Sequence, residues 1–469
     1  MKIQRRNALT LAATALLAAC ATQSPSGADT TSAAAPTPII FVHGNGDSAA
    51  LWQTTLWRFE SNGWPRERLH AIDVPYPLAR DDDTKAQPGR TSTAEHMAYL
   101  KAEVDKVMQR TGARQVILLA NSRGGNAVRN YIQNGGGAAV VSHAVLGGTP
   151  NHGVWATKGF REANEFSGTG PFLMGLNAAK NAAGDEVAGP VKWMTIRSDN
   201  NDKFAQPDGL WIGAKGTPTN VTFAGPELKG AFNIVIPRID HRETSFSPAA
   251  FEATYRFITG QAPKTLAITP ENTLTLSGQV TGMGVSSLDP ASGGFVNNLA
   301  IPGAKVEVFA VDAATGSRLG AAAYAGTVGA DGRWGPLAAQ AGSAYEFVIN
   351  AAGYATTHIY RSPFPRSSAI MHLRAERLAA ADKTAAGEKG AIINFTRPRG
   401  YFDLGRDKLS FDGNAIPPGL PPSGAGLAAS KLILTDGLRS ISADFNGEKI
   451  VGRAWSATEN HITFLEMHY

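Results

Sequence analysis

The chain has 469 residues, of which 43% are hydrophobic and 18% are charged. This length exceeds that of one typical domain, and the composition excludes an intrinsically disordered chain. The formal net charge of +5 falls to +2 when the three basic residues of the N-terminal segment, Lys2, Arg5 and Arg6, are left out. The charge balance therefore does not favour nucleic acid as a partner.

The first twenty residues have the pattern of a secretory signal: a basic start, an apolar Leu/Ala core and small residues before a cleavage site. Leu17-Ala18-Ala19-Cys20 resembles the lipobox of bacterial lipoproteins, whose cysteine is diacylated and becomes the mature N-terminus. Cys20 is the only cysteine in the chain, so it has no disulfide partner. We therefore expect an exported lipoprotein of the cell envelope. The outer membrane is the preferred location, and the cell surface or secretion are the alternatives. Residues 21–37, rich in Ser, Thr, Ala and Pro, are expected to form a flexible tether.

Residues 38–262 alternate apolar strand patterns with helical ones, which predicts an α/β fold with a mostly parallel, doubly wound sheet. The strands are expected at 38–42, 69–73, 115–120, 142–146, 191–196 and 232–236, and the helices at about 48–61, 93–110, 123–133 and 248–259.

The motif Ala120-Asn121-Ser122-Arg123-Gly124 joins a buried strand to a helix. A serine at such a sharp strand-to-helix turn, with small residues two positions before and after it, is typical of the nucleophile elbow of α/β-hydrolases. Ser122 is therefore the candidate nucleophile. The oxyanion hole is expected from the backbone N–H of Arg123 and that of Asn45, because Gly44 and Gly46 permit close backbone approach there.

Residues 153–190 interrupt the alternation with several aromatic residues among glycines. Two interpretations stay open: an acyl-binding cap near the mouth of the site, or two small helices that cover the sheet.

The serine needs a base and an acid, which follow it in the order Ser, Asp, His in this fold. His241 lies after the strand expected at 232–236 and before the last helix, where the base belongs. Asp202, five residues before Pro207, is the preferred acid, and Asp199 is the alternative. No metal-binding or cofactor-binding motif is present, so neither a metal nor a cofactor is expected.

Beyond residue 262 the pattern changes to short strands separated by Gly, Asp and Pro turns. Two all-β domains are expected, a sandwich at 263–380 and a second domain at 381–469, with a linker at 379–388. The turns Gly329–Trp334 and Ala352–Tyr354 in the first of them resemble the small transthyretin-like or carboxypeptidase-regulatory-like modules of secreted enzymes. No catalytic motif occurs in this half.

The turn His43–Gly46, the segment Ser61–Asp73 and the elbow resemble the small secreted bacterial lipases of the lipase class 2 type. The resemblance covers residues 38–262, about half of the chain, and implies an α/β-hydrolase serine esterase. The β domains are similar to the arrangement in an archaeal lipase with a C-terminal lipid-binding β domain. Two features depart from the family pattern, namely Asn121 in place of the common histidine and the long segment 153–190.

We therefore expect a serine carboxylic ester hydrolase, a lipase or carboxylesterase that acts on lipids or other insoluble esters. The close alternative among enzymes is a polyester depolymerase, which uses the same chemistry and whose β domains bind the polymer. From a different class, a catalytically inactive surface-binding protein can use the same scaffold. The complete Ser–Asp–His order and the intact His-Gly-Asn-Gly turn favour an enzyme.

Overall fold

The computed structural model describes residues 35–283 and 297–469. The expected signal segment, the lipidation site Cys20 and most of the tether lie outside the described residues. Within the described ranges, no helix is long and apolar enough to cross a bilayer.

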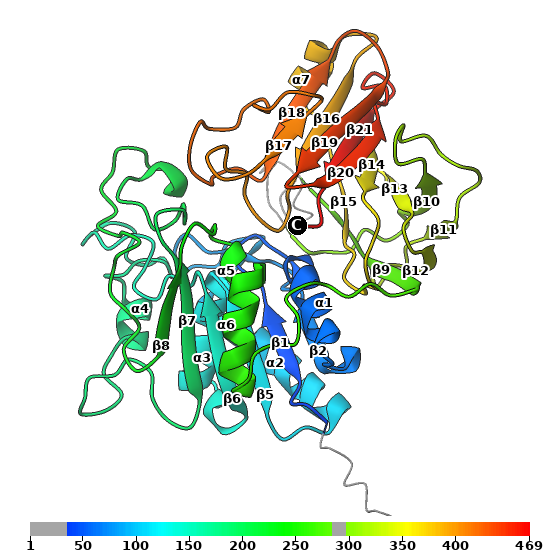
Figure 1. The fold of residues 1–469 in the computed structure, drawn as a ribbon. Coiled ribbons are helices and arrows are strands. Elements are labelled where there is room, and N and C mark those ends of the chain that lie inside the picture. The colour runs from blue at the N-terminus through cyan, green and yellow to red at the C-terminus, as the bar shows by residue number, and fades with distance from the viewer. Residues whose placement is uncertain (1–34, 284–296) are drawn as a thin grey trace, which may run out of the picture. The chain divides into compact units, whose positions relative to one another are not determined.

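The first half of the described chain, residues 35–262, is built around one six-stranded sheet in which every neighbouring pair of strands is parallel (Figure 1). The strands, in spatial order, are β2 (Leu69–Ile72), β1 (Ile39–Val42), β5 (Val116–Asn121), β6 (Val141–Gly147), β7 (Lys192–Ser198) and β8 (Phe232–Ile236). The predicted parallel sheet is therefore confirmed, and the carboxyl ends of its strands share one edge.

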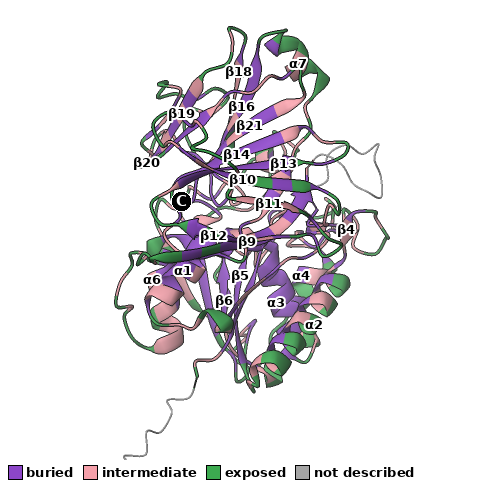
Figure 2. Cartoon of the chain, turned by 90° about the vertical axis from the view of Figure 1, so that its right-hand side faces the viewer, coloured by how far each residue is buried: buried purple, intermediate pink, exposed green. Residues whose placement is uncertain are grey.

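Helices cover both faces of this sheet, because alternate residues of each strand point to opposite sides. On β1, Ile40 and Val42 pack into the cluster formed with α2 and α3, whereas Ile39 and Phe41 pack with α1 and α6. Figure 2 shows α2 and α3 on one side of β5 and β6 and α1 and α6 on the other. The helices of this half are α1 (Gln53–Ser61), α2 (Thr93–Thr111), α3 (Arg123–Asn134), α4 (Pro171–Leu176), α5 (Glu243–Phe246) and α6 (Pro248–Thr259). Short 3-10 turns occur at Ala49–Trp52, Arg66–Arg68, Gly137–Ala139 and Leu210–Ile212, and β3 (Leu78–Ala79) pairs with β4 (Arg90–Thr91).

The second half is a β region, and its described residues, 263–283 and 297–469, form one seven-stranded and two three-stranded sheets. The large sheet runs in the order β11 (Tyr324–Thr327), β10 (Lys305–Val311), β13 (Ala344–Asn350), β14 (Thr356–Arg361), β21 (His461–Glu466), β16 (Ala391–Thr396) and β18 (Ala429–Leu434). The small sheets are β12 (Arg333–Gln340), β9 (Thr273–Gly282) and β15 (Leu373–Ala375), and β17 (Leu409–Phe411), β19 (Ser440–Phe445) and β20 (Glu448–Arg453).

The large sheet continues across residue 380, because β14 pairs with β21 in parallel. The segment 379–388, expected as a linker, instead contains the helix α7 (Ala380–Ala386). Its alanines favour a helix, and Ala386 is buried in a small apolar cluster with Ile392 and Ala457. Segments far apart in the sequence thus form a joint β region.

Candidate active site

Ser122 occupies a strained turn between β5 and α3. Its φ of +51° and ψ of −124° lie outside the regions that a residue with a side chain normally adopts. The Ser122 N–H donates to the carbonyl of Gly147 on the neighbouring strand at 2.8 Å. Such strain persists only where surrounding contacts enforce it, and it is common at functional sites.

The residue two positions beyond the serine is small because the elbow crosses β1 closely. A Cβ added to Gly124 would lie 2.6 Å from the carbonyl oxygen of His43 and 2.7 Å from that of Val42. Both atoms belong to the backbone, so neither can move aside cheaply. Gly124 therefore lets α3 begin directly against the end of β1, next to the turn expected to form the oxyanion hole.

His241 and Asp202 meet as an imidazole–carboxylate pair. His241 Nδ1 lies 2.8 Å from Asp202 Oδ2, and both residues are buried. In residues 35–283 and 297–469, no group forms a hydrogen bond with His241 Nε2. The second ring nitrogen is therefore free to exchange a proton with a hydroxyl.

Asp199, the alternative acid, lies elsewhere in the same loop. Its Oδ1 accepts a hydrogen bond from the backbone N–H of Asn201 at 3.2 Å, and its Oδ2 accepts one from that of Arg238 at 3.0 Å. These contacts brace the loop, and the structure brings Asp202 rather than Asp199 to the imidazole.

One cavity of about 190 Å³ is lined by both Ser122 and His241, together with Gly44 and Asn45 of the early turn. Much of its remaining wall is apolar or aromatic and comes from Val154, Trp155, Phe166, Phe204, Trp211, Ile212 and Tyr401. The chain thus surrounds a hydroxyl and an imidazole with a surface suited to hydrocarbon.

The turn at Gly44 and Asn45 is held against the elbow. A Cβ on Gly44 would lie 2.9 Å from the Cβ of Ser122, so only glycine permits this approach. Val74 N–H donates to His43 Nε2 at 3.0 Å, so the proton of His43 is on Nδ1 and is donated to the carbonyl of Gly44 at 2.9 Å. Burial lowers the pKa of His43, which keeps its ring neutral. His43 is therefore a structural part of the turn.

The two expected oxyanion donors have different supports. Asn45 is fixed by its side-chain oxygen, which accepts a hydrogen bond from the backbone N–H of Ala79 at 2.8 Å. Arg123 is the first residue of α3, and the N–H groups of a first helical turn have no acceptor within the helix. Both backbone segments flank Ser122, although only Asn45 lines the cavity itself.

The side chain of Arg123 points away into the protein. Its guanidinium forms an ion pair with Glu165 at 2.8 Å, and neither side chain is more than 2% exposed. Burial raises the pKa of Glu165, and Arg123 opposes that rise. This pair ties the segment 153–190 to the start of the elbow helix.

The segment 153–190 contains one short helix, α4, rather than two. Val154, Trp155 and Phe166 of this segment line the cavity that contains Ser122. Its aromatic residues thus contribute directly to the wall of the site.

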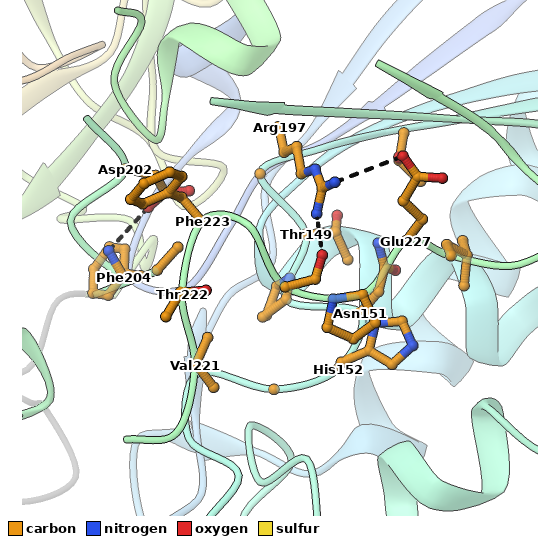
Figure 3. Close-up of a pocket in the computed structure, with 18 of the residues that line it drawn as sticks. Thr149, Asn151, His152, Arg197, Asp202, Phe204, Val221, Thr222, Phe223 and Glu227 are labelled. Atoms are coloured by element: carbon orange, nitrogen blue, oxygen red, sulfur yellow. Dashed lines mark hydrogen bonds and ion pairs between the residues drawn. The ribbon is translucent and has the colours of Figure 1, made fainter. Parts of the chain in front are cut away.

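A second cavity of about 360 Å³ adjoins the first, and Phe204 and His241 line both. Figure 3 shows Asp202 and Phe204 at one end of it and Arg197 and Glu227 at the other. Phe204 packs edge-on against His241 with 4.7 Å between the ring centroids. The imidazole therefore lies between two cavities, and Ser122 lines only the smaller one.

Two family models match the chain. Residues 36–187 match the lipase (class 2) model, and residues 272–378 match that of a lipase C-terminal domain. The protein is an α/β-hydrolase lipase with a C-terminal β domain. It is accordingly a carboxylic ester hydrolase. Ser122 and the turn at Gly44 and Asn45 lie inside the first match, whereas Asp202 and His241 lie outside both.

Solved structures similar to this lipase match it at low identity. The propeptide form of the Bacillus licheniformis lipase BlEst2 is 16% identical, with 67% of this chain and 90% of that chain covered and a TM-score of 0.35. For Aspergillus fumigatus lipase B the identity is 13%, the coverage 49% and 54%, and the TM-score 0.34. This chain thus spans about half the length of the Aspergillus protein. Because these TM-scores lie below 0.5, the assignment rests on the two family models.

The β region of the lipase reaches the site through Tyr401, which lines the cavity of Ser122. Lys203 Nζ lies 3.9 Å from the centroid of the Tyr401 ring and 4.9 Å from that of Trp211, and it donates to the carbonyl of Gly426 at 2.9 Å. Burial lowers the pKa of Lys203 to about 8. Because Lys203 directly follows Asp202, its cation–π contact with Tyr401 joins the loop of Asp202 to the β region.

Two contributors to the lipase site escaped the sequence analysis. Asn121 was noted only as a departure from the family pattern, yet its amide Nδ2 donates to the carbonyls of Gly147 and His241, each at 3.2 Å. It therefore ties the elbow to the loop that carries His241. Tyr401 carries no local signal, because 161 residues separate it from its hydrogen-bonding partner Asp240.

Proposed function

We propose that this lipase hydrolyses carboxylic esters through Ser122, His241 and Asp202. The observation that carries the proposal is the cavity shared by a strained serine and an imidazole whose Nδ1 is held by Asp202 at 2.8 Å. A neutral serine hydroxyl is a weak nucleophile, so it needs such an oriented base.

In the proposed reaction, His241 Nε2 accepts the proton of the Ser122 hydroxyl as Oγ attacks the ester carbonyl. Asp202 keeps the proton on Nδ1 and stabilises the imidazolium that forms. The N–H groups of Asn45 and Arg123 receive the developing oxyanion, and one such donor is worth ~10²–10³ in rate. His241 then protonates the leaving alcohol, and the acyl group stays on Ser122 Oγ. A water molecule that gives a proton to His241 attacks this acyl-enzyme, and Ser122 recovers its proton from His241 as the acid is released.

The substrates we propose are lipids or other water-insoluble esters. The apolar wall around Ser122 supports an acyl chain as the bound group, since buried hydrocarbon contributes about 0.8 kcal/mol per CH₂. Exposed apolar residues on the nearby loops, Leu210 and Phe223 at 46% and 40% exposure, support contact with an insoluble phase.

A panel of p-nitrophenyl esters of increasing acyl length, an emulsified triacylglycerol and a polyester film tests the substrate class. We expect hydrolysis of the soluble esters and of the emulsion, because both present an ester beside an apolar chain. Erosion of the film without hydrolysis of the emulsion would replace the lipid substrate with a polyester. Failure on every ester would favour the inactive binding protein.

We also propose that the protein is exported and anchored at the cell envelope through a diacylated Cys20. The lipobox pattern Leu17–Cys20 and the absence of any other cysteine support this location. Together with N-acylation, the acyl chains supply buried methylene groups at about 0.8 kcal/mol each, which suffices for stable anchoring when two or more chains are present.

Replacing Cys20 by serine tests the anchor. In the native host, we expect the parent protein to fractionate with membranes and to incorporate labelled palmitate, and Cys20→Ser to lose the label because serine offers no thiol. Hydrolysis of a soluble short ester by Cys20→Ser serves as the control and should persist, since residues 21–37 lie between Cys20 and the catalytic half in the sequence. A soluble, unacylated mature parent protein would contradict the lipoprotein proposal.

A further inference from the structure

Asp240, the residue before His241, is a buried carboxylate that organises the turn carrying the imidazole. Its exposed fraction is 0%. Oδ1 accepts hydrogen bonds from the backbone N–H groups of Arg242 at 2.8 Å and of Glu243 at 2.9 Å. The carboxylate therefore closes the backbone around His241 in the manner of an Asx turn.

The other oxygen of the same carboxylate is held from the β region. Asp240 Oδ2 accepts hydrogen bonds from Arg397 Nη1 at 2.8 Å and from the backbone N–H of Tyr401 at 2.8 Å. Arg397 Nη2 donates to Glu243 Oε1 at 2.5 Å, and Arg406 Nη1 donates to Glu243 Oε2 at 2.5 Å. One arginine thus holds two acidic residues that flank His241 on either side.

The charge of Arg397 matters because these acids are out of water. Burial, and then the nearby charge of Glu243, raise the pKa of Asp240 to about 6, while Arg397 and Arg406 oppose that rise. Without Arg397 one of the two opposing charges would be gone, so the pKa of Asp240 would rise further and its carboxyl would take up a proton more readily. A protonated carboxyl accepts fewer hydrogen bonds, so the turn around His241 would lose its fixed geometry.

We propose that Arg397 is a positioning residue of the active site, one that holds the 240–243 turn so that His241 stays aligned between Asp202 and Ser122. This inference rests on the proposed function of His241 as the base. Arg397 directly follows β16 and lies outside both matched family segments. A residue of the β region thereby acts on the rate of the chemical step.

Simple attachment of the β region to the catalytic half does not require Arg397. Trp57 donates to the carbonyl of Ser367 at 2.8 Å, and His372 lies 2.8 Å from Asp73. Arg366 also forms an ion pair with Glu60 at 2.9 Å. These contacts lie away from His241, so the loss of Arg397 should leave the two halves packed together.

The test compares Arg397→Met with Arg399→Met in the full chain, using a soluble p-nitrophenyl ester. Arg399 is a matched control, because it is equally buried and donates to the carbonyls of Met467 and His468 within the β region. We expect Arg397→Met to lower kcat by ~10²-fold with KM nearly unchanged, since misplacing a reacting group acts on the transition state. Arg399→Met should keep kcat within about threefold of the parent even when it lowers Tm.

Two further variants keep the test decisive. Arg397→Lys should recover part of kcat, because an ammonium group retains the charge but not the fork that reaches both acids. Asp240→Asn should lower kcat, and adding Arg397→Met to it should cause less than the additive loss, since the two act through one contact. If Arg397→Met proves insoluble, Arg397→Lys compared with Arg399→Lys gives the same measurement.

Parental kcat in Arg397→Met, or an equal loss of kcat in Arg399→Met, would overturn the inference. The failure of the proposed function is distinguishable from this result. If His241→Ala retains activity, the base itself is wrong. If His241→Ala abolishes activity while Arg397→Met does not, only the role of Arg397 fails.

Discussion

Replacing Ser122 by alanine is expected to lower kcat/KM for a soluble ester by at least about 10⁴-fold. The substitution removes only Oγ and keeps Cβ, so the elbow, with its strained φ of +51°, should form as in the parent. Steady-state kinetics on a p-nitrophenyl ester and a thermal unfolding curve measure the two effects separately. We expect a large loss of rate with a Tm close to that of the parent.

Activity within about tenfold of the parent would exclude Ser122 as the nucleophile. His241→Ala is the partner variant, and it should cause a loss of similar size, because the base and the nucleophile act as one unit. The double variant Ser122→Ala/His241→Ala should therefore be little worse than either single variant.

Asp202→Asn is expected to lower kcat by about 10⁴-fold, because an amide facing Nδ1 favours the wrong tautomer of His241. In the parent protein, Asp202 Oδ2 lies 2.8 Å from His241 Nδ1, and Asp202 Oδ1 accepts a hydrogen bond from the backbone N–H of Phe204 at 2.9 Å. An asparagine side chain keeps an oxygen for the second bond, so the acid loop should remain folded.

Asp199→Asn is the matched control, since it changes the same residue type in the same loop. Its contacts go to the backbone N–H groups of Asn201 and Arg238 rather than to the imidazole. We expect kcat close to that of the parent and a modest loss of stability, measured as the free energy of unfolding in urea. A larger loss of kcat in Asp199→Asn than in Asp202→Asn would move the acid to Asp199.

The catalytic sheet was predictable because its signals are local. The apolar run at 115–120 became β5, and the helix expected at 93–110 became α2. Ser92 and Glu95 form a reciprocal capping box at the start of α2, and Gly112 ends it in the left-handed conformation. A strand buried in a parallel sheet gives a short apolar run, and helix capping gives characteristic residues at the helix ends. Both patterns can be recognised within a few residues of sequence.

The contribution of the β region was not predictable in the same way. Arg397, Tyr401 and Arg406 carry no pattern that distinguishes them from other polar residues between strands. Their roles depend on contacts with Asp240 and Glu243, more than 150 residues away in the chain. The helix α7 was missed for a related reason, since Ala386 is buried only once distant strands surround it.

Labelling with a fluorophosphonate, followed by mass mapping of the modified peptide, tests the proposed nucleophile most directly. Such a probe is attacked by an activated serine and stays bound to its Oγ. We predict one adduct per chain, located on Ser122, and none in Ser122→Ala. An adduct on another residue, or ester hydrolysis that continues while Ser122 stays unmodified, would contradict the assignment of Ser122 as the nucleophile.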